Sequence, residues 1–181
     1  MATLVVLLAI GLFAIGYFKG QEMQIGDSQA GVPELRPEAR YNQDAMKISS
    51  EFSLGVDMIN VIAETTPDAC TESFKAMENI DRFAWHMTNV EGVQKVITLA
   101  QIAKIITAGW NEGNIKWREL SRNNYVMRQS LSGVETDTGL LNRDCSAMPV
   151  TIFTEDHKAT TINNVVKAVH DYQEANPAQV D

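Results

Sequence analysis

The sequence predicts an α+β domain in which two strand-and-helix units share one sheet, preceded by an apolar N-terminal helix. In the first unit, residues 150–155 alternate with the two-residue period of a strand, and residues 160–172 carry apolar groups at helical spacing. In the second unit, residues 55–99 have the pattern strand, helix, strand. Because a strand followed by an amphipathic helix cannot bury either face alone, we expect both units to pack in one sheet.

The chain begins with an uncharged apolar stretch, residues 2–18. As a helix it would be ~25 Å long, at the short end of what crosses a bilayer. Tyr17, Phe18 and Lys19 follow as an interfacial anchor would. We therefore predict a transmembrane helix over residues 1–20. A cleaved signal peptide is the second interpretation, although no Lys or Arg precedes the apolar run, and a buried core helix is the third.

Residues 21–48 are predicted to form an extended connector, because glycines and prolines recur there with little periodicity. A short helix could begin near residue 41 and reach residue 50. The domain itself is expected over residues 49–176, with a short tail over residues 177–181.

The strand–helix–strand unit begins with residues 55–64, which are apolar at neighbouring positions and so predict a central strand covered on both faces. After a turn, Asp68 or Thr71 is expected to cap a helix that ends near residue 89. Residues 93–99 are the second predicted strand. Its inward side chains are expected to be Val93, Ile97 and Leu99, and its outward ones Gln94 and Thr98.

Residues 100–147 are predicted to be a mostly helical insertion, with a helix over residues 100–108 that ends at Gly109. The element order is then β-α-β, insertion, β-α. A ferredoxin-like domain has the order β-α-β-β-α-β, so one strand is missing after the last helix. We predict an open sheet edge there, or an edge filled by another segment.

The composition disfavours nucleic-acid partners, because the formal charge of −8 repels phosphate backbones. The sequence contains no Gly-x-Ser-x-Gly, Walker or GxGxxG motif, no CxxC pair and no closely spaced histidines. His86, His157 and His170 are isolated, and for the Asp156-His157 pair no nucleophile is suitably spaced. We therefore predict no cofactor, no metal and no enzymatic activity.

The chain has two cysteines, Cys70 and Cys145. If the apolar N-terminus delivers the chain to an oxidising compartment, a disulfide between them is favoured over two buried thiols. Chain-entropy arithmetic for so long a loop gives about 4–5 kcal/mol of stabilisation. Five methionines at apolar positions are interpreted as core side chains rather than as the lining of a lipid cleft: Met58, Met77, Met87, Met127 and Met148.

Several stretches together resemble one family, the resistance-nodulation-division (RND) exporters of the MMPL, or hydrophobe-exporter, type. The resemblance covers nearly the whole chain and is carried by residues 25–44, 83–87 (Phe-Ala-Trp-His-Met), 93–97 (Val-Gln-Lys-Val-Ile), 108–114 (Ala-Gly-Trp-Asn-Glu-Gly-Asn) and 138–158. It implies a helix that opens one half of a transporter, followed by most of a ferredoxin-like porter domain in the periplasm, at the bacterial inner membrane.

The resemblance also implies partners: the remainder of the transporter or other membrane subunits, the membrane, and a lipid or other hydrophobic substrate. Such exporters couple proton entry to transport through acidic residues inside central membrane helices, and no acidic residue lies within residues 2–18. We therefore expect this chain to supply substrate-handling surface but no energy coupling. The alternative is a free-standing periplasmic binding or adaptor domain with a signal peptide or one membrane tether.

Overall fold

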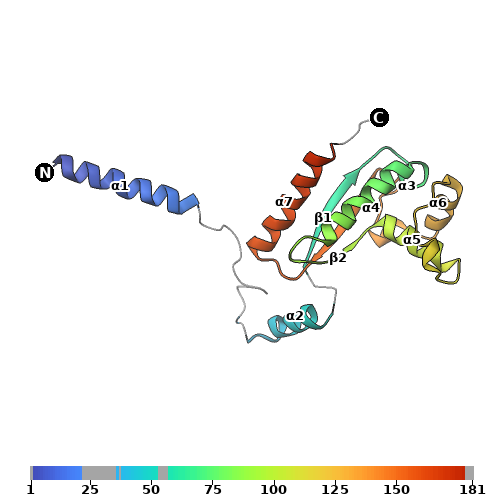
Figure 1. The fold of residues 1–181 in the computed structure, drawn as a ribbon. Coiled ribbons are helices and arrows are strands. Elements are labelled where there is room, and N and C mark those ends of the chain that lie inside the picture. Colours follow the sequence, from blue (N-terminus) through green and yellow to red (C-terminus); the bar gives the residue numbers. More distant parts are fainter. Residues whose placement is uncertain (1, 22–35, 37, 53–56, 178–181) are drawn as a thin grey trace.

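The computed structural model describes residues 2–21, 36, 38–52 and 57–177, and over these the chain is α+β, as predicted (Figure 1). Two 3-10 turns, Ile115–Trp117 and Thr136–Thr138, lie on either side of the helix over residues 124–131. The other elements, in chain order, are α1 (Ala2–Gln21), α2 (Arg40–Glu51), β1 (Asp57–Glu64), α3 (Ala69–Glu72), α4 (Phe74–Thr88), β2 (Val93–Ile97), α5 (Leu99–Gly109), α6 (Asn124–Leu131), β3 (Ala147–Thr154) and α7 (Ala159–Ala175).

The three described strands form one antiparallel sheet in the order β1-β3-β2. The β1–β3 register runs from Asp57 opposite Thr154 to Glu64 opposite Ala147. The expectation that both units share a sheet is therefore confirmed. Because β1 and β2 both run antiparallel to β3, they run parallel to each other with β3 between them.

The prediction that the first strand is central and covered on both faces is wrong for the described residues. β3 takes the central place, so β1 lies at the edge of the sheet. Its side chains alternate between half-buried and exposed, and Met58 and Ile62 are both more than half exposed. The apolar residues on the outward side of β1 therefore stay uncovered by the described chain.

The hydrophobic core lies on one face of the sheet, under α4 and its neighbouring helices (Figure 1). Helical spacing places Met77, Ile80, Ala84 and Met87 on one face of α4, and all four are buried. From β3, Met148, Val150 and Ile152 point into the same core, and α7 adds Val165. Alternation along β3 thus places every second side chain against the helices.

Two local details differ from the sequence-based expectation. A short helix, α3, precedes α4, and Ser73 rather than Asp68 or Thr71 caps α4, with its hydroxyl accepting from the Ala76 N–H at 3.2 Å. In β2, a register shift between Val93 and Lys95 turns the side chains that follow to the opposite face of the sheet from the one predicted. Val96 is therefore buried where Ile97 was expected, and Thr98 is buried as the cap of α5.

The N-terminal helix is present as α1. None of the helices in the described part of the chain is both long enough and apolar enough to cross a membrane, so the transmembrane helix predicted over residues 1–20 is not found. Helix α2 crosses the expected boundary at residue 48 between connector and domain, because the chain is already helical from Arg40. The remaining connector, residues 22–35, and residues 178–181 of the tail lie outside the described residues.

Candidate functional site

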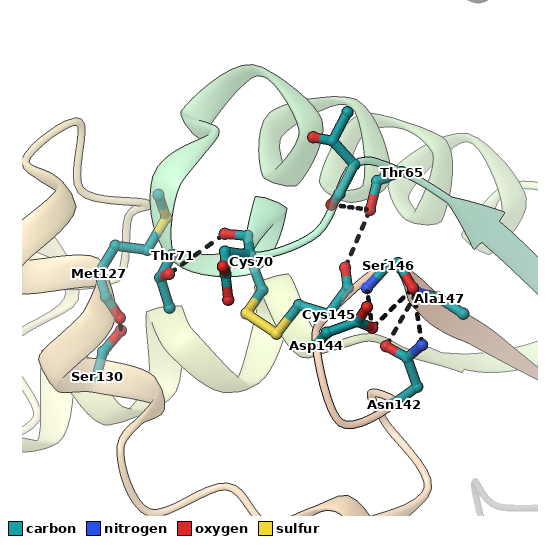
Figure 2. The surroundings of a disulfide bond; sticks show 12 residues. Thr65, Cys70, Thr71, Met127, Ser130, Asn142, Asp144, Cys145, Ser146 and Ala147 are labelled. Atoms are coloured by element: carbon teal, nitrogen blue, oxygen red, sulfur yellow. Dashed lines mark hydrogen bonds between the residues drawn. A yellow bond between two sulfur atoms is a disulfide. The ribbon is translucent and has the colours of Figure 1, made fainter.

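The predicted disulfide between Cys70 and Cys145 is present. Cys70 lies in α3 and Cys145 lies two residues before β3, and their Cα atoms are 5.6 Å apart, an ordinary separation for a disulfide. Both residues are more than nine-tenths buried. The bond joins residues 75 positions apart (Figure 2) and so ties the start of α3 to the start of the central strand.

Backbone hydrogen bonds join the same two segments beside the disulfide. The Thr65 N–H donates to the Ser146 carbonyl at 2.9 Å, and the Asp68 N–H donates to the Asp144 carbonyl at 2.7 Å. The Thr65 hydroxyl donates to the Cys145 carbonyl at 3.0 Å. Cys145 has a φ of 57°, in the left-handed region that disfavours side chains. These bonds and the disulfide together hold this unfavourable conformation.

Asp144 organises the loop that leads into β3. Its carboxylate accepts hydrogen bonds from the Ser146 hydroxyl at 2.7 Å and from the Ser146 N–H at 3.2 Å (Figure 2). These bonds favour the charged form and hold the pKa of Asp144 below its ordinary value of 3.8. Asn142 closes the loop by accepting from the Ala147 N–H and donating to the Ser146 hydroxyl.

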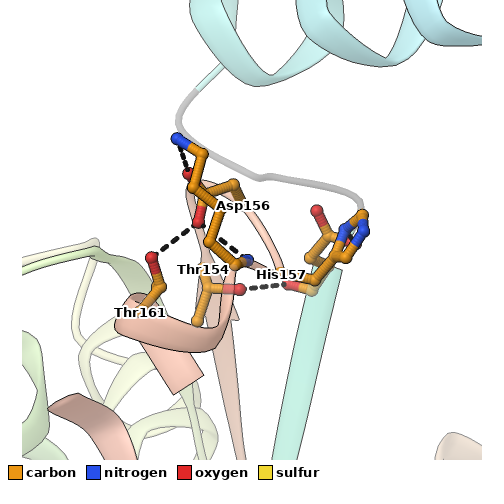
Figure 3. A network of polar contacts seen from close by, with 6 residues as sticks. Thr154, Asp156, His157 and Thr161 are labelled. Atoms are coloured by element: carbon orange, nitrogen blue, oxygen red, sulfur yellow. Dashed lines mark hydrogen bonds and ion pairs between the residues drawn. The ribbon is translucent and has the colours of Figure 1, made fainter. Parts of the chain in front are cut away.

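Asp156, singled out in the sequence beside His157, lies three residues before α7, and its side chain holds the first turn of that helix. Its carboxylate accepts from the Thr161 hydroxyl at 2.6 Å and from the Lys158 N–H at 3.2 Å, and pairs with the Lys158 ammonium at 2.7 Å (Figure 3). Burial opposes the charged form, but the bonds from Lys158 and Thr161 outweigh it and lower the pKa of Asp156. The hydrogen bond and ion pair with Asp156 in turn raise the pKa of Lys158.

His157 faces a different carboxylate. Its Nδ1 lies 3.2 Å from Oδ1 of Asp57, at the start of β1. Asp156 and His157 therefore serve two separate junctions: Asp156 holds the first turn of α7, and His157 joins that turn to β1. This arrangement gives a structural role to both residues and does not assemble the acid–base pair considered from the sequence.

The methionines divide into two groups. Met77, Met87, Met127 and Met148 are almost completely buried in the core, which confirms the core interpretation for these four. Met58 is 57% exposed, so that interpretation is wrong for Met58. The difference arises because Met58 lies on the side of β1 that faces away from the helices.

The other two histidines lie on helices. His86 is half-buried, with its ring 5.2 Å from that of Tyr172. Its Nε2 atom is buried and has no hydrogen-bond partner among the described residues. His170 is exposed on α7. In the part of the chain that the structure describes, no cluster of His, Cys, Asp and Glu could hold a metal ion.

Two grooves flank the pair α4 and α7. One, of about 530 Å³, reaches α5 and is lined by charged groups that include Asp81 and Lys104, whose side chains form an ion pair at 2.6 Å. The other, of about 560 Å³, follows the free edge of β1, and its apolar lining is Val61, Ile62, Ala63, Ala76, Ile80, Phe83, Val169 and Tyr172. Neither groove was predicted from the sequence, although the predicted missing strand indicated an open sheet edge such as the one the second groove follows.

Comparisons with protein families, with curated proteins and with solved structures found no match to this chain.

Proposed function

We propose that this chain is the membrane-anchored periplasmic portion of a proton-driven RND-type exporter of lipids or other hydrophobic compounds. In this proposal it supplies substrate-handling surface, and other parts of the exporter supply energy coupling. The two sheet units would belong to a ferredoxin-like porter subdomain. The resemblance of the sequence motivates the proposal, and the observation that carries it is the exposed apolar surface of α1.

Helix α1 exposes large apolar side chains around its whole circumference. The exposed fraction exceeds one half for each of them: Val5, Val6, Leu8, Ile10, Leu12, Phe13, Ile15, Tyr17 and Phe18. Isolated apolar side chains on a surface are ordinary, but a continuous apolar surface of this kind marks a binding or membrane surface. We assign the burial of this surface to contact with a bilayer, to which α1 would anchor the chain without forming a full span.

The disulfide supports the proposed periplasmic location. Disulfides persist in oxidising surroundings such as the periplasm and are rare in the bacterial cytosol. The Cys70–Cys145 bond is buried and joins distant segments, as a permanent structural bond does. A domain displayed in the periplasm from a membrane anchor meets this condition.

The substrate-handling surface we assign is the sheet face turned away from the helices. There Met58 lies opposite Phe153, and Ile62 lies opposite Pro149, on the two sides of a hydrogen bond from the Thr151 hydroxyl to Asn60. Met58 and Ile62 are exposed, and the β3 side chains of this face are half-buried. A flat apolar strip with one polar pair fits an amphipathic, lipid-like molecule.

The anchor is tested by extracting bacterial membranes with alkaline carbonate. We expect the wild-type chain to stay in the membrane pellet, and the double variant Leu8→Asp, Phe13→Asp to be released. Ile115→Asp is the matched control, because Ile115 is equally apolar and is 79% exposed outside α1; it should stay in the pellet. Release of the wild-type chain, or retention of the double variant, would contradict the anchor.

The substrate surface is tested with a photoreactive amino acid, benzoylphenylalanine, at position 62, in membranes that contain phospholipid. We expect a lipid adduct, detected by mass, at position 62. The control position is 125, because Tyr125 is also highly exposed but lies on α6. Equal labelling at both positions, or none at position 62, would favour the adaptor alternative.

A further inference from the structure

We propose that the free edge of β1 is a docking site for a fourth β-strand, which pairs antiparallel with β1 and covers the groove between β1, α4 and α7. The strand comes from the remainder of the exporter, so the identity of its source rests on the proposed function, whereas the pairing does not. Three observations on separate elements lead to this one occupant.

The first observation is the backbone of β1. Because the Thr65 N–H bonds to the Ser146 carbonyl, odd-numbered residues of β1 bond to β3, and even-numbered residues direct their N–H and C=O groups away from it. The outward groups are those of Met58, Asn60, Ile62 and Glu64. No described strand lies on that side of β1. A row of outward backbone donors and acceptors is the template that an added strand uses.

The second observation is the groove of about 560 Å³ along this edge. Val61 and Ala63 form its floor, and Ile80 and Phe83 of α4 form one wall. A strand paired with β1 would direct every second side chain into this space, because side chains alternate along a strand. A groove of this volume could also hold a small ligand, but such a ligand would leave the outward N–H and C=O groups of β1 unpaired.

The third observation is the apolar side of α7. Ile162, Val166 and Val169 are spaced to lie on one side of the helix. Val169 lines the groove, while Ile162 and Val166 are 37% and 44% exposed. Val165, which points into the core, is fully buried. The exposed stripe of α7 therefore continues from the groove, over the place where a strand next to β1 would lie.

The direction of the added strand relative to β1 follows from the position of the C-terminal end of α7. Gln173 and Asn176, at the C-terminal end of the helix, line the groove together with Glu64, Thr65 and Thr66, at the C-terminal end of β1. A strand joined to this end of α7 would run back along β1 in the antiparallel direction. Antiparallel pairing is also what β1 already forms with β3.

The test extends the full chain after Asp181 with a flexible linker and an eight-residue strand in which valine and threonine alternate. The matched control replaces the valines by prolines, which lack the N–H group that the ladder requires. Hydrogen exchange of single amides is measured by NMR in detergent micelles. We expect exchange at Met58, Asn60, Ile62 and Glu64 to slow at least tenfold with the valine extension and to be unchanged with the proline extension.

Val61 and Ala63 are the internal controls, because their N–H groups already bond to β3 and should stay protected in both proteins. If the extension disturbs the fold, they lose protection, and the valine–threonine strand is then added to the unextended chain as a free peptide with the same readout. Equal exchange of the four outward amides with both extensions or peptides would overturn the proposal. Dimers of the unextended chain with these amides protected would also overturn it, by assigning the edge to a second copy. Neither result depends on membrane extraction, which tests the proposed function separately.

Discussion

The two ends of the β1–β3 strand pair can be compared directly, because the same two strands are fastened differently at each end. Beyond Glu64 and Ala147, the chain segments are joined by a buried disulfide and by backbone hydrogen bonds. Beyond Asp57 and Thr154, they are joined by His157, whose Nδ1 lies 3.2 Å from the Asp57 carboxylate, while the neighbouring Asp156 holds the first turn of α7. One end therefore depends on a covalent bond that a reductant breaks, and the other on polar side-chain contacts, although both ends fix the register of the same two strands.

The disulfide end should show the largest effect. Replacing Cys70 and Cys145 by alanine should lower the free energy of unfolding by about 4 kcal/mol, because the unfolded chain regains the freedom of a loop of 75 residues. The measurement is urea unfolding followed by tryptophan fluorescence. A loss below about 1 kcal/mol would show that the hydrogen bonds around Thr65 and Asp68 hold this end without the disulfide.

A variant pair separates the bond from the backbone conformation it holds. With Cys70 replaced by alanine, Cys145→Gly should be more stable than Cys145→Ala by about 1 kcal/mol, because only glycine adopts a φ of 57° without cost. Equal stability of the two variants would mean that this conformation relaxes once the disulfide is gone.

At the opposite end, Gly92→Ala should destabilise by about 2 kcal/mol. Gly92 has a φ of 87°, and a Cβ there would lie 2.8 Å from Cγ2 of Thr161, whose hydroxyl is bound to Asp156. The control is Gly133→Ala, where a Cβ meets no atom within 4 Å. Comparable unfolding curves for the two variants would contradict the close packing of Gly92 on α7.

Asp156→Asn should cost about 1–2 kcal/mol at pH 7, through the weakened bonds to Lys158 and Thr161. The pKa of Asp156 is lowered in the folded protein, so its contribution is complete above the ordinary value of 3.8 and is lost as the pH falls through the folded value. Wild type and variant should therefore keep their difference down to the ordinary value of 3.8 and converge only below it, as the pH falls through the lowered folded value. Glu155→Gln, at the exposed neighbouring residue, should change little across the same range. A difference that does not shrink as the pH falls below 3.8 would exclude the carboxylate as its cause.

The smallest effect is expected from the exposed ion pair beside the disulfide. Arg128 of α6 lies 3.1 Å from Glu72 of α3, and both side chains are more than half exposed. Arg128→Ala should cost less than about 0.5 kcal/mol, since water and salt screen such pairs. A double-mutant cycle with Glu72→Gln measures the coupling energy between the two side chains. A coupling above 1 kcal/mol would show that this ion pair stabilises the disulfide end more than its exposure indicates.

The sequence predicted most of the elements because their periods are strong. The change of period near Asp156 located β3 and α7, and the apolar spacing of α4 identified its buried face. The disulfide was also predictable, because only two cysteines exist. What failed depended on other segments: β1 could not be recognised as an edge strand until β3 was known to pair with both neighbours. The side chains of β2 after Gln94 face the opposite way from the prediction, because Gln94 is an extra residue in the strand pairing. The hydrophobic period of the sequence does not reveal such an extra residue.

The candidate sites were less predictable for the same reason. Met58 has the same side chain as the buried Met77, and only its place in the sheet makes it exposed. Asp156 and His157 are adjacent in sequence, which suggested a reactive pair, but their partners Thr161 and Asp57 could be identified only from the fold. The open edge of β1 was the exception, since counting elements already indicated a missing strand.

The disulfide also closes a covalent ring from Cys70 to Cys145 that contains α4, β2, α5 and α6, while β1 and β3 lie just outside it. A protease cut anywhere in the ring, for example in the exposed stretch around Trp117, would open the ring without separating the two pieces. Such a nicked molecule would migrate as an intact chain until a reductant is added. The insertion could accordingly be cleaved or lengthened while both strands stay attached to one another.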